Sequence, residues 1–195
     1  MIRNNIKLLS LGIFLELVVL VFSYYESNGV ITPFFQSCAK LSGRISLLFF
    51  SLLLIYQTLV PDLKDKEIVK TKYYLSLNFS IIHIIHWVLL VIAVYLSGFE
   101  LVPFRVAGGT IAYVMIILLP FAIKGKILRK TALKTIMNLY LFYVWLIFFM
   151  TYVARLTSKN IHFTGSKTSY VLLIAFTSML MIWRLFLLTK NKLAK

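Results

Sequence analysis

The sequence is poor in cysteine and in charge. Cys38 is the only cysteine among 195 residues, which excludes an architecture stabilised by disulfides. Charged residues make up 14% of the chain and hydrophobic residues 61%, whereas soluble globular proteins have about 25% charged residues. A chain of this composition has too little polar surface to cover a water-soluble particle. A soluble enzyme, a disordered chain and a repeat solenoid are therefore excluded.

Motifs for phosphate binding, zinc catalysis and serine hydrolysis are also missing. The sequence has no glycine-rich phosphate loop, no His-Glu-x-x-His pair and no Gly-x-Ser-x-Gly elbow. The longest expected connection, residues 26–40, is too short to hold a soluble domain. The net charge of +15 fits basic loops beside a lipid bilayer better than it fits a nucleic-acid-binding protein. We therefore expect one transmembrane domain over residues 1–195 and no nucleic acid partner.

Six long apolar stretches are present instead. A helix needs about 20 mostly apolar residues to cross the hydrocarbon core of a bilayer. None of the six stretches alternates as a strand would, so the predicted fold class is an all-α integral membrane protein, a bundle of six transmembrane helices. The expected spans are Lys7–Tyr25, Leu41–Val60, Leu75–Ser97, Val102–Ile123, Thr135–Leu156 and Ser169–Thr189.

Basic residues are distributed unequally over the connections between these spans. The side that holds both termini carries 14 lysines and arginines and the other side carries 6, with Arg184 left inside a span. Cytoplasmic loops of membrane proteins are enriched in basic residues, so both termini are predicted to be cytoplasmic. An even number of helices likewise requires both termini to lie on one side of the membrane.

A pair of histidines lies within the third span. His83 and His86 are three residues apart and therefore share one face of the predicted helix. Imidazoles inside a helix bundle can ligate heme iron, relay protons or form hydrogen bonds between helices. The residues alone leave all three roles open.

Two charged residues inside spans need a partner, because a charge in the middle of a bilayer costs at least about 2.5–3.5 kcal/mol. Glu16 lies near the middle of the first span, and Arg184 lies near the end of the sixth. Their depths differ by roughly 7 Å at 1.5 Å per residue, so an intramembrane ion pair is one expectation. The other is that Glu16 is protonated and Arg184 reaches lipid phosphates.

Further polar residues lie at the ends of the spans. Arg44, Arg105 and Arg155 fall at the outer ends of the second, fourth and fifth spans, where they would bind either lipid headgroups or anionic groups such as heme propionates. Three amide side chains are each expected to hydrogen-bond another helix: Gln57, Asn78 and Asn138.

A series of short motifs lies between residues 25 and 155 in a characteristic order. In chain order they are Asn28-Gly29, Thr32-Pro33, Ser42-Gly43-Arg44, Val60-Pro61, Gly109-Thr110-Ile111-Ala112 and Leu119-Pro120-Phe121-Ala122. This order resembles the ferric-reductase-like transmembrane domain family, and within it the heme-binding membrane subunit of the periplasmic methionine sulfoxide reductase system. The resemblance implies bound heme b, with His86 rather than His83 matching the family's histidine in the third span.

The fifth span departs from the family pattern. Family members carry two histidines there, whereas this chain has Asn138 at the first position and no histidine at the second. His83 and His86 cannot hold one heme from both faces, because they project from one side of one helix. The topology places His83 at a depth near Met137 and Asn138, so a His/Met pair of ligands is a conceivable replacement.

Three functions follow as hypotheses. The first is a heme-b electron-transfer subunit of an oxidoreductase, which would pass electrons from quinone or a redox partner protein to an outer acceptor. The second is a heme-free relative that acts as a membrane scaffold or assembly subunit, because the histidines of the fifth span are missing. The third is transport of a solute or proton through Glu16, Arg184 and the histidine pair. The expected location is the bacterial cytoplasmic (inner) membrane, and no metal other than heme iron is expected.

Overall fold

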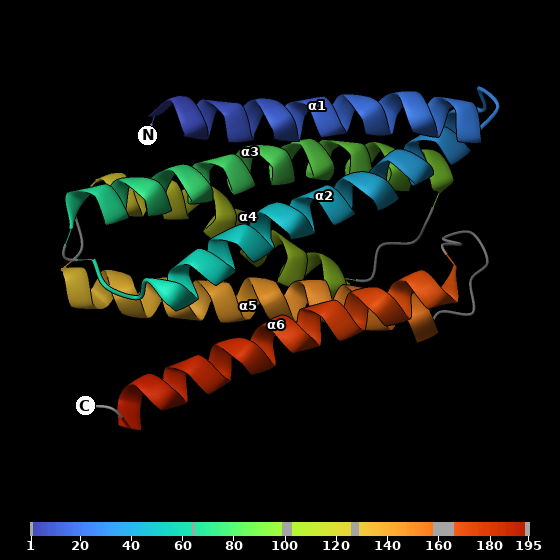
Figure 1. Ribbon diagram of the computed structural model, residues 1–195. Helices are drawn as coiled ribbons and strands as arrows, with labels where there is room; N and C mark the ends of the chain where they lie inside the picture. Colours follow the sequence, from blue (N-terminus) through green and yellow to red (C-terminus); the bar gives the residue numbers. More distant parts are fainter. Residues whose placement is uncertain (1, 64, 99–102, 126–128, 158–165, 194–195) are drawn as a thin grey trace.

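The structure is a computed structural model that describes residues 2–63, 65–98, 103–125, 129–157 and 166–193, with side chains at the same positions except 2–5, 103–105, 130 and 191–193. The helices are α1 (Ile2–Glu26), α2 (Ile31–Leu59), α3 (Lys66–Ser97), α4 (Pro103–Lys124), α5 (Lys130–Thr157) and α6 (Lys167–Leu193) (Figure 1). Within these described residues, all six are long and apolar enough to cross a membrane and no strand is formed. The predicted all-α membrane fold is confirmed.

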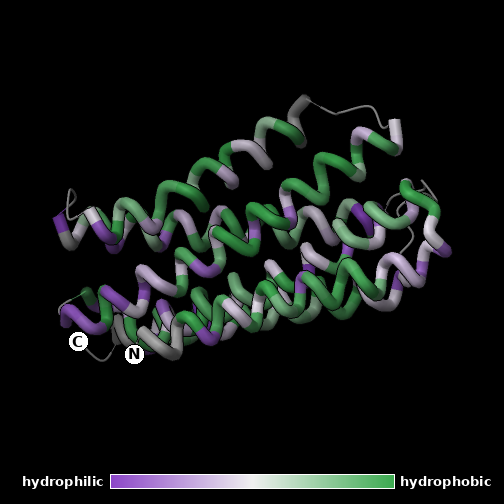
Figure 2. Tube along the Cα trace, turned by 90° about the horizontal axis from the view of Figure 1, so that it is seen from above, coloured by the Kyte–Doolittle hydropathy of each residue, from purple (hydrophilic) through white to green (hydrophobic). Residues whose placement is uncertain are grey.

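The second helix is the centre of the bundle. It packs along α3 and also contacts α1 and α6, while α4 packs on α3 and α5. Figure 1 shows α1 and α6 at opposite edges, with α2 crossing obliquely between them. The beginning of α1 and the end of α6 lie at the same end of the bundle. Hydrophobic residues occupy most of each helix, and hydrophilic residues are more frequent toward the helix ends (Figure 2).

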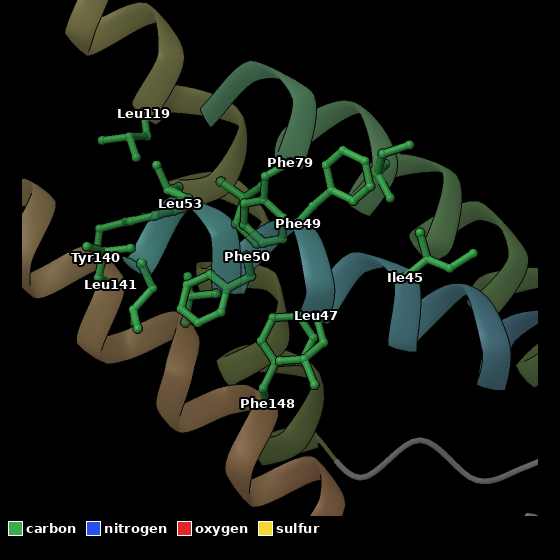
Figure 3. Packing of buried hydrophobic residues seen from close by; sticks show 14 of the residues in the cluster. Ile45, Leu47, Phe49, Phe50, Leu53, Phe79, Leu119, Tyr140, Leu141 and Phe148 are labelled. Carbon is green, nitrogen blue, oxygen red and sulfur yellow. The ribbon is translucent and has the colours of Figure 1, made fainter. Parts of the chain in front are cut away.

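Buried aromatic and aliphatic side chains of α2, α3, α4 and α5 form the core. Phe50 of α2 packs against Phe79 of α3 and Phe148 of α5, with a ring centroid separation of 5.5 Å in each pair. Leu53 of α2 and Tyr140 of α5 belong to the same buried cluster, and both are labelled in Figure 3. The core therefore continues along the oblique path of α2.

The expected loop over residues 26–40 is wrong, because α2 already begins at Ile31 instead of Leu41. The connection is a short turn in which Asn28 and Gly29 adopt positive φ angles of 49° and 75°. Pro33 does not prevent the earlier start, since it lies in the first helical turn, where a backbone N–H has no partner within the helix. The third helix also begins earlier than expected, at Lys66 instead of Leu75.

The connection between α2 and α3 is fixed at both helix ends. Val60 precedes Pro61, which disfavours helical geometry, and its φ and ψ of −124° and 72° end α2. Asp65 caps α3, since its side chain accepts a 2.9 Å hydrogen bond from the backbone N–H of Glu67. Lys72, in the second turn of α3, donates to the backbone oxygen of Asp62 at 2.9 Å.

A proline inside α4 is compensated by α3. Pro120 has no N–H to donate to the backbone oxygen of Ile116, which in a regular helix would accept from residue 120. The hydroxyl of Ser80 lies 2.6 Å from this oxygen and also 2.8 Å from the backbone oxygen of Ser76 in its own helix. An otherwise unpaired carbonyl inside the membrane is thereby satisfied by the neighbouring helix.

The close contact of α1 with the bundle depends on Gly12. An ideal Cβ atom at this position would lie 2.6 Å from Cζ of Phe49 in α2 and 2.7 Å from Cδ1 of Ile82 in α3. Only glycine lets the α1 backbone approach both helices at this point.

Candidate functional site

Hydroxyl groups of α2 bond polar side chains of three other helices. The contacts are Ser42 Oγ to Glu16 Oε1 of α1 (2.9 Å), Ser46 Oγ to His83 Nδ1 of α3 (2.5 Å) and Arg184 Nη1 of α6 to Thr58 Oγ1 (2.8 Å). Ser42 and Ser46 are four residues apart on α2, so they lie on one face of it. Buried carboxyl, imidazole and guanidinium groups are thus distributed around one helix.

His83 is enclosed by four helices. Its Nδ1 atom pairs with the Ser46 hydroxyl, and its ring stacks on Tyr113 of α4 with a centroid separation of 4.6 Å. The rings of Phe79 and Phe148 lie 5.3 and 5.8 Å away on other sides. Three roles were left open for the histidines. The contacts of His83 correspond to the third role, a hydrogen bond between two helices.

His86 lies directly against the backbone of α2. A Cβ atom added to Gly43 would lie 3.0 Å from Cε1 of His86, and the imidazole forms a hydrogen bond to the backbone of Ala39. The rings of His86 and His83 are 5.5 Å apart. The Nδ1 atom of His86 is buried and has no hydrogen-bond partner among the described residues.

The expected depth of Met137 beside His83 is wrong. His83 contacts Phe148 of α5, which is eleven residues after Met137. At 1.5 Å per residue, this separation along the helix is about 16 Å. Met137 is fully buried in the core and cannot face His83 across a single iron atom.

The residues around the histidines do not fit the heme that the resemblance implies. A porphyrin held by a histidine needs a flat slot against an imidazole nitrogen, and the pair of ligands that the resemblance implies also needs a second donor on the opposite face of the iron. The sides of His83 are occupied by Tyr113, Phe79 and Phe148, and His86 packs on Gly43. The expected second ligand is three helical turns away. Among the described residues, no three His, Cys, Asp or Glu side chains gather around one point either.

The expected ion pair between Glu16 and Arg184 is not formed. Glu16 accepts a hydrogen bond from Ser42, whereas Arg184 donates to Thr58 and to Asn138 at 2.8 Å each. The physical reason is the packing order: α1 lies on α2 and α3, while α6 lies on α5 and α2 at the opposite edge (Figure 1). Arg184 is buried, with 4% of its surface exposed, so it does not extend out of the bundle toward lipid phosphates.

The three arginines predicted at the outer helix ends are only partly described. Arg44 donates to the hydroxyl of Ser169 in α6 at 3.0 Å. The side chain of Arg105 lies outside the described residues. Arg44 therefore joins α2 to α6.

Sequence analysis missed the serines that bond Glu16 and His83. Ser42 entered only as part of a motif, and Ser46 was not selected, although hydroxyl residues four apart in an apolar span are a signal for contacts between helices. The expectation for Asn138 is confirmed by its bond to Arg184. For Gln57 the expectation is wrong, since both atoms of its buried amide lack a hydrogen-bond partner among the described residues.

Substitution of Ser46 by alanine is expected to destabilise the protein by about 1–2 kcal/mol, because the buried Nδ1 atom of His83 loses its partner. Ser51→Ala is the matched control: Ser51 is buried on the same helix but donates only to Leu47 of α2 itself. Unfolding of both variants by heat in detergent measures the difference. Equal losses of stability would show that the bond to His83 contributes nothing.

The resemblance to the ferric-reductase-like family rests on the order of motifs along the chain. In the structure, Ser42 bonds α1 and Gly43 contacts His86. Pro120 lies opposite Ser80. Helix packing therefore accounts for these motif residues, and none of their contacts points to a cofactor. Comparisons of the chain with models of known protein families, with curated proteins and with solved structures find no match.

Proposed function

We propose that the chain is a membrane-embedded binding or assembly subunit that works without heme. The observation that carries this proposal is the packing of His83, which Ser46, Phe79, Tyr113 and Phe148 hold in place. A heme ligand needs an accessible imidazole nitrogen, whereas the Nδ1 atom of this imidazole is bonded to Ser46 and joins two helices. The missing histidines of α5 support the same interpretation.

The proposed location is the cytoplasmic membrane of a bacterium, with both termini in the cytoplasm. The excess of basic residues on the terminal side, 14 against 6, supports this orientation. The common end at which α1 begins and α6 finishes is compatible with it. Reporter fusions at the two termini that are active only outside the cytoplasm would contradict the proposal.

An absorption spectrum tests the absence of heme. The full chain is expressed with added heme precursor, purified in a neutral detergent and measured in oxidised and reduced form. We expect no Soret band and no b-type bands in the reduced-minus-oxidised difference. A b-type spectrum that His83→Ala or His86→Ala abolishes would overturn the proposal. That result would instead support a heme-b electron-transfer subunit of an oxidoreductase, fed by quinone or a redox partner protein.

The assembly role has a separate test. The chain extracted gently from its native membranes should migrate on a native gel as a larger particle than the purified chain in the same detergent. Identical migration of the two samples would contradict a role as a subunit. The result of the native gel does not depend on whether heme is bound. It therefore shows separately whether the chain belongs to a larger assembly or is a free-standing protein.

A further inference from the structure

One oxygen of the Glu16 carboxyl group is buried without a partner. The side chain is 4% exposed, Oε1 accepts a 2.9 Å hydrogen bond from Ser42, and Oε2 has no hydrogen-bond partner among the described residues. A buried carboxylate needs a cation or several donors, and where these are lacking a proton removes the charge. Glu16 is therefore expected to carry a proton on Oε2.

The groups that face Glu16 do not supply a positive partner for Oε2. Its helix packs on α2 and α3. On α2 the titratable group of this face is Cys38, one turn before the serine that bonds Glu16. On α3 it is His86: Gly12 meets Ile82, and Glu16 and His86 each lie one turn further along helices that run in the same direction (Figure 1). Neither is bonded to Oε2, and Glu16 forms no ion pair among the described residues.

Further polar side chains lie between α1 and α2, from Glu16 toward the turn that joins the two helices. Ser23 is seven residues after Glu16 on the same face of α1, and Cys38 is four residues before Ser42 on the same face of α2. Both are fully buried. The Ser23 hydroxyl lies beside the Cys38 thiol, which is a weak partner, and its Oγ atom has no hydrogen bond among the described residues. We call these four residues the α1–α2 seam.

Helix packing alone does not account for Ser23. Several buried hydroxyl groups of other helices donate to the backbone oxygen four residues earlier in their own helix, as Ser51, Thr58, Ser80 and Thr177 do. The Ser23 hydroxyl forms no such bond. It therefore keeps both its donor and its acceptor available in the seam.

The seam reaches the surface at the α1–α2 turn. Ser37, next to Cys38, donates to Oε2 of Glu26, whose side chain is 45% exposed and also lies 3.7 Å from Nζ of Lys40. Glu26 is ten residues after Glu16, which is about 15 Å along the helix. This end of the bundle lies opposite to the chain termini (Figure 1). Polar groups thus extend from the buried carboxyl group to an exposed one.

We propose that Glu16 is a proton-binding site that exchanges its proton with water at the α1–α2 turn along this seam. On release, the proton passes from Oε2 to a water molecule and leaves one negative charge on Glu16; uptake reverses the step. Hydroxyl groups suit such a path because each can donate and accept a hydrogen bond. The site uses no heme and does not depend on the proposed function.

Infrared spectroscopy tests whether Glu16 holds the proton. The full chain is purified in a neutral detergent, and the C=O stretching band of protonated carboxyl groups is recorded at neutral pH. We expect this band in wild type and not in Glu16→Gln, which keeps the size of the side chain. If the two spectra agree in this region, Glu16 does not hold a proton and the site is overturned.

Transfer into heavy water tests the path. The band shifts as deuterium replaces the proton, and the rate of this shift measures access to Glu16. We expect Ser23→Ala to slow the shift by about tenfold, as for the loss of one hydrogen bond from the path. Ser51→Ala is the matched control, since it removes a buried hydroxyl group outside the seam, and should exchange at the wild-type rate.

A shift in Ser23→Ala that is no slower than in Ser51→Ala would overturn the path along the seam. Should Glu16→Gln fail to fold, wild type labelled with ¹³C at the glutamate carboxyl groups decides whether the band belongs to glutamate. The described glutamates other than Glu16 have exposed side chains that pair with lysines: Glu26 with Lys40 and Glu67 with Lys70. A band that does not move with the label would overturn the site.

Discussion

Replacing Gly12 with leucine is expected to destabilise the bundle by about 3 kcal/mol, because α1 can then no longer approach α2 and α3. A Cβ atom alone would overlap Cζ of Phe49 at 2.6 Å and Cδ1 of Ile82 at 2.7 Å. Both neighbours are buried, Phe49 at 5% and Ile82 at 0% exposure, so they cannot give way without disturbing the core. As α1 moves outward, Glu16, one turn further along, loses its bond to Ser42.

Gly109→Leu provides the control for this substitution. No atom lies within 4 Å of a Cβ added to Gly109 in α4, so only helix propensity changes there, by up to about 1 kcal/mol in favour of leucine. Thermal unfolding in detergent should therefore show a large loss for the Gly12 variant and none for the Gly109 variant. Similar Tm values would mean that α1 is not held by close packing at Gly12. Phe49→Leu should partly rescue Gly12→Ala by making room for the methyl group.

Ser80→Ala is expected to cost about 1–3 kcal/mol, because it leaves the backbone oxygen of Ile116 without a donor inside the membrane. The cost depends on Pro120, since only a residue with an N–H can supply the missing bond from within α4. In a Pro120→Ala background, the same serine substitution should therefore cost much less.

The double-mutant cycle of Ser80 and Pro120 measures this dependence. Wild type, both single variants and the double variant are unfolded under the same conditions, and the coupling free energy is expected to be about 1–2 kcal/mol. Thr110→Ala serves as the control in α4, because Thr110 is exposed and bonds only Val106 of its own helix. Additive effects in the cycle would show that Ser80 does not compensate for the proline.

The six spans could be predicted from the sequence because lipid requires long apolar helices. The beginnings of α2 and α3 could not, since both helices extend beyond their most apolar parts. Ser37 and Cys38 are polar or small and fall in the predicted loop, yet both are buried in α2. Lys72 was counted as a loop residue but is buried in α3 by its bond to Asp62. Tertiary contacts therefore stabilise helical turns that hydropathy assigns to loops.

The same error in helix ends explains part of the misplaced histidine. His83 is 17 residues from the beginning of α3, and Phe148 is 18 residues from the beginning of α5, so the two parallel helices bring them to one depth. With the expected beginnings at Leu75 and Thr135, the same count pairs His83 with Tyr143, so the corrected helix ends move the match by about four residues toward Phe148. His83 and His86 are three residues apart, so their burial on one face of the helix was predictable from the sequence. Ser46, the partner of His83, was not, because the oblique path of α2 determines which hydroxyl faces α3.

The central place of α2 has a consequence for biosynthesis. Arg44 and Thr58 emerge early from the ribosome, but their partners Ser169 and Arg184 belong to α6, which is made last. Until α6 is made, Arg44 lacks the Ser169 hydroxyl that it bonds in the finished bundle, whereas the Thr58 hydroxyl already donates to the backbone oxygen of Leu54 in its own helix. A nascent chain that stops after α5 therefore leaves this basic residue of α2 without its partner. Completion of α6 is the step that supplies this partner.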